Sequence, residues 1–168
     1  APFAASLLPA GLGLFWGAAT LLYRRFSSGH VTRVLLFAAL FCALEWLRGH
    51  VLTGFPWNPA GAAWKAGGTM SQIASIVGVY GLSLITVAAV SAIGTLVTVG
   101  RRRDRFLAAG AGIAVLILAF AFGAQRLHQA RPETAGVLLR IVQANVDQES
   151  KWTPEAYADI VRRYVTLT

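Results

Sequence analysis

The chain has 168 residues, of which 56% are hydrophobic and only 13% are charged, and its mean hydropathy is +0.59. About a quarter of the residues in an ordinary soluble domain are charged, so this composition argues against a soluble domain and favours a membrane protein. The net charge of +8 does not indicate nucleic-acid binding, because the arginines stand in short runs between apolar segments and form no basic face or nucleic-acid motif.

Long apolar runs predict four membrane-spanning helices, over about residues 1–23, 31–47, 75–99 and 106–127. Each is close to the roughly 20 residues that cross a bilayer. The uncharged stretch 66–100 is too long for one span, so we take about 78–99 as its bilayer part and 66–77 as an outer shoulder or an extra turn. Residues 1–127 are therefore expected to be a mainly α-helical, polytopic domain with antiparallel neighbours.

The arginines predict how these helices are oriented. The loops 24–33 and 100–105 carry Arg24, Arg25, Arg33, Arg101, Arg102, Arg103 and Arg105. The intervening loop 48–70 carries only Arg48 and Lys65. Since basic loops stay in the cytoplasm, we expect loop 48–70 and the residues after about 127 on the outer face. That orientation also places Ala1 outside, which predicts an odd number of spans before it and an internal piece of a longer protein.

The C-terminal part predicts the beginning of a second domain, residues 136–168. Residues 136–146 are rich in β-branched side chains and are typical of a strand. Thr153 and Pro154 are suited to cap and begin a helix. One strand and one helix cannot bury a core, so we expect this domain to be truncated at Thr168.

Glu45 and Arg48 are charged residues at the end of an apolar segment. Their spacing places them on one helix face, and charge inside a membrane usually marks a working site. One hypothesis is that Arg48 attracts a lipid phosphate and that Glu45 orients it. The alternative is a modest ion pair at the membrane surface.

The loop after Arg48 is predicted to be stiff. Pro56 and Pro59 cannot continue a helix. Phe55 and Trp57 fall at the depth where aromatic belts are common. They are either part of such a belt or a rigid aromatic rim beside an opening for acyl chains.

Two segments resemble one protein family. Residues 45–57, E-W-L-R-G-H-V-L-T-G-F-P-W, are similar to the E-x-L-R-G-x-x-L-T-G-F-P-W segment of apolipoprotein N-acyltransferases. Residues 141–152, I-V-Q-A-N-V-D-Q-E-S-K-W, resemble the opening of the nitrilase-like domain of the same enzymes, where a strand ending in V-Q-x-N/D is followed by K-W. The resemblance thus covers both halves of the chain, in the expected order.

This resemblance implies an enzyme of the bacterial inner membrane, with loop 48–70 and the residues after about 127 in the periplasm. Its partners would be a phospholipid acyl donor, a diacylated apolipoprotein acceptor and membrane lipid, without a metal or other cofactor. An αββα nitrilase-like domain would carry a Glu–Lys–Cys triad, whose Cys holds the acyl chain as a thioester. That triad is expected beyond Thr168, so no catalytic residue lies in this chain and the chain alone should be inactive. Among its own residues, the resemblance implies a substrate-binding role for Trp152, beside Arg48, Trp57, Phe55 and Glu45.

Three other hypotheses remain open from the sequence. The helices could be an unrelated anchor fused to a soluble-type nitrilase or amidase, which the shaped 45–57 segment disfavours. They could form a non-catalytic scaffold or half-transporter, although charges avoid the span centres and only Pro9 interrupts one. The acyltransferase-like part could also be fused to a glycosyltransferase domain.

Overall fold

A computed structural model of the chain describes residues 2–27, 32–51, 54–98, 100–130, 136, 140–149, 151 and 153–167. The chain divides into two compact units, Ala1–Ala130 and Arg131–Thr168. The helices of the first unit are α1 (Pro2–Phe26), α2 (Thr32–His50), α3 (Ala74–Gly94) and α4 (Arg102–Gln129), and its short 3-10 turns are η1 (Ala60–Ala63), η2 (Met70–Ile73) and η3 (Thr95–Val97).

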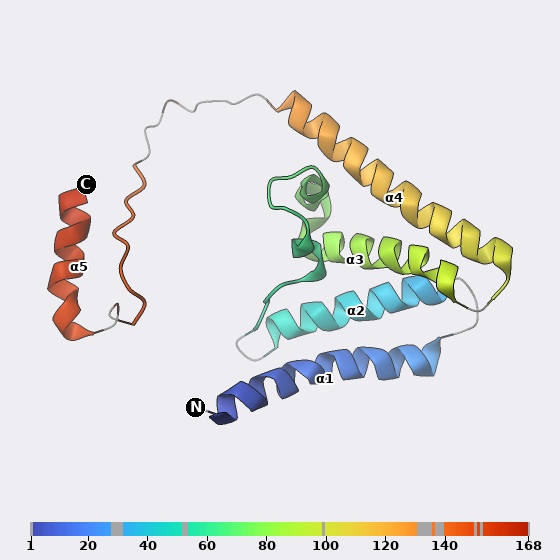
Figure 1. Cartoon of the computed structure of the whole chain (residues 1–168), viewed down its shortest axis with the longest axis horizontal. Coiled ribbons are helices and arrows are strands. Elements are labelled where there is room, and N and C mark those ends of the chain that lie inside the picture. The colour runs from blue at the N-terminus through green and yellow to red at the C-terminus, as the bar shows by residue number, and fades with distance from the viewer. Residues whose placement is uncertain are drawn as a thin grey trace. The chain divides into compact units, whose positions relative to one another are not determined.

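Each predicted span falls on one of the four helices of the first unit. Neighbours along the chain pack together, α1 on α2, α2 on α3 and α3 on α4, and α4 crosses the others at an angle (Figure 1). Among the described residues, Ser6–Phe26, Met70–Val97 and Arg102–Gln129 are long and apolar enough to cross a membrane. Helix α2 carries three charged residues and is not among them, so its span stays a prediction.

Hydrogen bonds show which loops share an end of the helical bundle. Arg33 Nη2 donates to Thr98 Oγ1 at 2.8 Å, which joins the two arginine-rich turns. At the other end, Arg126 Nε donates to Gln72 Oε1 at 3.2 Å, so the C-terminal end of α4 lies beside η2. The alternation of loops between two ends, on which the predicted orientation depends, is therefore present.

Helix α3 is interrupted at Gly78, where φ is 68° and ψ is 178°. Such a positive φ is strained for residues with a side chain, and glycine adopts it readily. A single turn, residues 74–77, precedes the break and the long regular segment follows it. The break lies at the residue where the bilayer part of this apolar run was predicted to begin, and the membrane boundary itself stays a prediction.

The second unit contains helix α5 (Pro154–Leu167), which begins at the predicted proline. The strand predicted over 136–146 is not formed in the described part of that range, residues 136 and 140–146. A strand must pair its backbone groups with a neighbour, and the described residues of this unit contain one segment without regular structure and one helix. The start of an αββα domain therefore stays a proposal.

Candidate functional site

Glu45 and Arg48 lie in the last turns of α2, inside the bundle. Their side chains are only 1% and 8% exposed. The side chains are therefore shielded from the surroundings of the helical unit, while their depth in the membrane stays a prediction. Buried charges are costly unless they are hydrogen-bonded, so their partners determine what these residues do.

Both side chains bind the backbone of the following loop. Glu45 Oε1 accepts a hydrogen bond from the Ala60 amide at 2.8 Å. Arg48 Nη2 donates to the carbonyl oxygen of Trp57 at 2.7 Å, and the Phe55 amide donates to the Arg48 carbonyl at 3.0 Å. Among the described residues no ion pair joins Glu45 to Arg48. Instead of Glu45 orienting Arg48, each residue fixes a different point of the loop.

Helix α3 holds the same loop from its other side. The Gly61 amide donates to Ser83 Oγ at 2.8 Å, and Trp64 Nε1 donates to Thr86 Oγ1 at 2.8 Å. A Cβ at Gly61 would lie 2.5 Å from the carbonyl oxygen of Val79, so the loop backbone approaches α3 closely. The structure thus contains the stiff, shaped loop that the two prolines predict.

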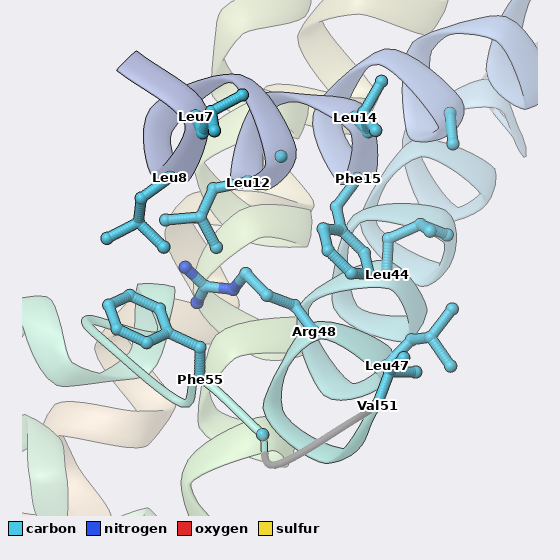
Figure 2. A pocket seen from close by; sticks show the side chains of 13 residues that line it. Leu7, Leu8, Leu12, Leu14, Phe15, Leu44, Leu47, Arg48, Val51 and Phe55 are labelled. Atoms are coloured by element: carbon cyan, nitrogen blue, oxygen red, sulfur yellow. The ribbon is translucent and has the colours of Figure 1, made fainter. Parts of the chain in front are cut away.

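A pocket of about 650 Å³ lies between α1, the end of α2 and this loop. Its walls are almost entirely apolar, and among the described residues that line it Arg48 is the only charged one. Figure 2 shows the Arg48 side chain extending from α2 toward Leu8 and Leu12 of α1, with Phe55 on the loop side. Because Leu7 and Leu14 in the α1 wall are 68% and 73% exposed, the pocket opens at the outer surface of this unit.

The Arg48 guanidinium retains binding capacity beside this pocket. Its carbon lies 5.5 Å from the ring centroid of Trp16 in α1, within the range of a cation–π contact. Its Nε is buried and has no hydrogen-bond partner among the described residues. A cation with an unused donor at an apolar pocket suits an amphiphile with an anionic head, since guanidinium groups bind phosphate through several donors.

The structure brings together some of the predicted site residues. Arg48 and Phe55 line the pocket, whereas Glu45 lies outside the lining and acts on the loop. The Trp57 side chain is 64% exposed and stacks on Phe55, with ring centroids 5.9 Å apart. Trp152 lies outside the described residues.

Sequence reasoning missed the contribution of α1. Leu8, Leu12 and Phe15 form one wall of the pocket, and Trp16 packs against Arg48. In the sequence these residues look like any lipid-facing positions of a span. The one signal in the sequence was Trp16, because an indole ring can make a cation–π contact with an arginine.

Groups of three or more His, Cys, Asp or Glu side chains that could hold a metal ion do not occur within the described ranges.

Comparison with known proteins identifies the family. The model of the apolipoprotein N-acyltransferase N-terminal domain matches residues 1–93. The chain is 48% identical over 169 residues to the apolipoprotein N-acyltransferase of Caulobacter vibrioides, which covers 100% of this chain and 31% of that protein. It is 39% identical over 170 residues to the enzyme of the same name from Bradyrhizobium diazoefficiens, covering 99% of this chain and 32% of that protein.

The chain thus spans about a third of the length of the curated relatives it matches. No solved structure matches it significantly. Because the family model covers more than half of its residues, the chain belongs to the apolipoprotein N-acyltransferase family.

Proposed function

We propose that this chain is the membrane-embedded part of an enzyme that transfers an acyl chain from a phospholipid to the N-terminal diacylglyceryl-cysteine of lipoproteins. The observation that carries the proposal is the apolar pocket with one buried cation, Arg48, in its wall. A phospholipid has the matching chemistry, because its acyl chains need an apolar surface and its phosphate needs a donor.

In this proposal Arg48 contacts the phosphate of the donor lipid. The phosphate would offset part of the cost of burying the guanidinium. The acyl chain would lie against the leucines of α1, with Phe55 at the end next to the loop. Glu45 is a positioning residue, since it acts through the loop by its hydrogen bond to Ala60.

The chemistry itself is assigned to the remainder of the protein. A cysteine thiolate would attack the lipid ester to form a thioester, breaking the acyl C–O bond and releasing the lysophospholipid as an alcohol. A glutamate would take the thiol proton and pass it to this leaving group, and a lysine would stabilise the oxyanion. The acceptor's α-amino group would then take the acyl chain and release the thiol. All three residues are expected beyond Thr168, in a nitrilase-like domain that begins near residue 136 and to which Trp152 belongs.

The proposal requires the Arg48 pocket and the C-terminal unit on the periplasmic side of the inner membrane. The hydrogen bond between Arg33 and Thr98 supports this orientation, because it joins the two turns that carry seven arginines at one end of the bundle. The pocket lies at the opposite end, where α2 finishes.

The test is acyl loading in the complete enzyme, measured as the thioester formed from phospholipid without acceptor. A charge-assisted hydrogen bond contributes about 1.5–3 kcal/mol, so Arg48→Ala should slow loading roughly 10- to 100-fold, which is more than it lowers the protein level. Arg48→Lys should retain part of the rate because it keeps the cation.

Two controls separate lipid binding from loop positioning. Lys65→Ala removes an exposed cation of the same loop and should leave loading unchanged. Glu45→Ala loosens the loop but keeps the cation, so it should lower kcat more than it raises KM for phospholipid, whereas Arg48→Ala should raise KM. Normal loading by a folded Arg48→Ala enzyme would reduce this bundle to a non-catalytic anchor for an amidase-type domain.

A further inference from the structure

A second pocket, of about 380 Å³, lies at the arginine-rich end of the bundle. Its lining includes Tyr23 of α1, Arg33 and Phe37 of α2, and Ser91 of α3. Arg33 and Arg48 are fifteen residues apart on one helix, which corresponds to about 22 Å along its axis. The two pockets are therefore separate sites.

The polar floor of this pocket is fixed in place. Thr98 is bound by two arginines, with Arg33 Nη2 donating to its Oγ1 at 2.8 Å and Arg105 Nη1 to its carbonyl oxygen at 2.6 Å. The Thr98 hydroxyl in turn donates to the Thr95 carbonyl at 2.8 Å. The Arg33 guanidinium is thereby held at the pocket, and one of its five N–H donors is bound to a described residue.

Further donors line the same pocket. The hydroxyls of Tyr23 and Ser91 make no hydrogen bond to the residues that the structure describes. Tyr23 is oriented by an edge-on contact with Phe37, with ring centroids 5.5 Å apart. A guanidinium and two hydroxyls together form a donor set suited to a phosphate group.

The surroundings add positive charge and an apolar wall. Arg24 and Arg25 lie in the last turn of α1. Arg101, Arg102 and Arg103 lie at the start of α4, followed by the acidic residue Asp104. Val34 and Phe37 line the pocket beside the polar groups. Inorganic phosphate has no apolar group that could pack against this wall. A lipid has such groups in its glycerol and the upper part of its acyl chains.

We propose that this pocket binds the headgroup of an anionic phospholipid from the leaflet at the arginine-rich end, with Arg33 contacting the phosphate. Basic pockets between membrane helices bind acidic headgroups in this way. The site is independent of acyl transfer, and its occupant would stabilise the junction of α1, α2 and η3 without being a substrate.

The experiment measures the Tm of the full-length protein in detergent. The additives are phosphatidylglycerol, phosphatidylcholine with the same acyl chains, and inorganic phosphate, each added separately. Phosphatidylglycerol should raise Tm by about 2–4 °C, because a ligand that binds only the folded state stabilises it. Phosphatidylcholine and inorganic phosphate should give less than half of that rise. Equal shifts with inorganic phosphate would overturn the assignment to a lipid.

Variants locate the effect. Arg33→Gln should abolish the rise, and the Tyr23→Phe, Ser91→Ala double variant should reduce it while keeping the bond between Arg33 and Thr98. Arg102→Gln removes an equal charge outside the pocket lining and should retain the rise. If Arg102→Gln lowers it as much as Arg33→Gln, or if the double variant has no effect, binding depends on net charge alone and the pocket proposal is wrong.

Discussion

The two ends of the helical bundle differ in how most of their charges are placed, although Arg33 and Arg105 at the arginine-rich end are hydrogen-bonded to Thr98. At the Phe55 end, Glu45 and Arg48 are buried and each is hydrogen-bonded to the backbone of one loop. At the other end, Arg101, Arg102 and Arg103 are exposed and stand in a run. Runs of exposed arginine orient helices, whereas a single buried charge with a defined partner shapes a site. Substitutions should therefore cost far more stability at the Phe55 end.

The largest effect is expected from Glu45→Ala. It removes the acceptor of the Ala60 amide and leaves a cavity beside a buried arginine, so we expect a loss of about 2–4 kcal/mol in the free energy of unfolding. The measurement is reversible unfolding in mixed SDS micelles. Glu45→Gln retains a carbonyl acceptor of the same shape and should cost less than half as much, and an equal loss from both would show that the carboxylate charge matters rather than this bond.

Glycine substitutions compare the two ends directly. A Cβ at Gly61 would lie 2.5 Å from the Val79 carbonyl oxygen and 2.8 Å from the Ser83 amide, so Gly61→Ala should cost about 1–3 kcal/mol. Gly94, at the arginine-rich end of α3, has no atom within 4 Å of a built Cβ. Gly94→Ala should be neutral or stabilising by up to about 1 kcal/mol, and unfolding in the same micelles measures both. Similar losses in the two variants would contradict the close approach of the loop to α3.

A smaller effect is expected from Trp64→Phe. It removes the hydrogen bond from Nε1 to Thr86 Oγ1, which contributes about 1 kcal/mol. Thr86→Val removes the other partner, and a double-mutant cycle should give a coupling energy near that value. Additive losses would mean that the indole stabilises the loop only by packing.

The smallest effect is expected from Arg102→Gln. The side chain is exposed and its carbon lies 5.5 Å from the Phe106 ring centroid, so the free energy of unfolding should change by less than about 0.5 kcal/mol. A loss comparable to that of Glu45→Ala would remove the distinction between the two ends.

Much of the helical unit could be predicted from the sequence, because apolar runs and arginine positions reflect local chemistry. The four helices and the non-helical loop at Pro56 follow from it, whereas the break at Gly78 was not predicted as such. The predicted span began at residue 106, four residues after the start of α4 at Arg102. The helix includes Arg102 and Arg103 because their exposed side chains do not have to be buried.

The partners of the site residues could not be predicted. Glu45 and Ala60 are fifteen residues apart, and whether a loop folds back that far depends on its tertiary contacts. From the sequence, Glu45 was therefore expected to orient its helical neighbour Arg48. The pocket wall formed by α1 could not be predicted either. A leucine that lines a pocket and a leucine that faces lipid give the same pattern in the sequence. The strand expected at 136–146 needs pairing partners that the described part of the second unit does not contain.

The proposed function requires that the Phe55 end of the bundle and the C-terminal unit lie in the same compartment. The direct test uses the full-length protein with Cys42, the single cysteine of residues 1–168, and every cysteine beyond Thr168, the proposed nucleophile included, replaced by serine. One cysteine is then introduced in turn at Trp57, Trp152 or Arg102. We predict that a membrane-impermeant maleimide added to intact cells labels positions 57 and 152 and leaves position 102 unlabelled until the membrane is opened. Labelling of 57 and 152 from opposite sides of the membrane would contradict the account.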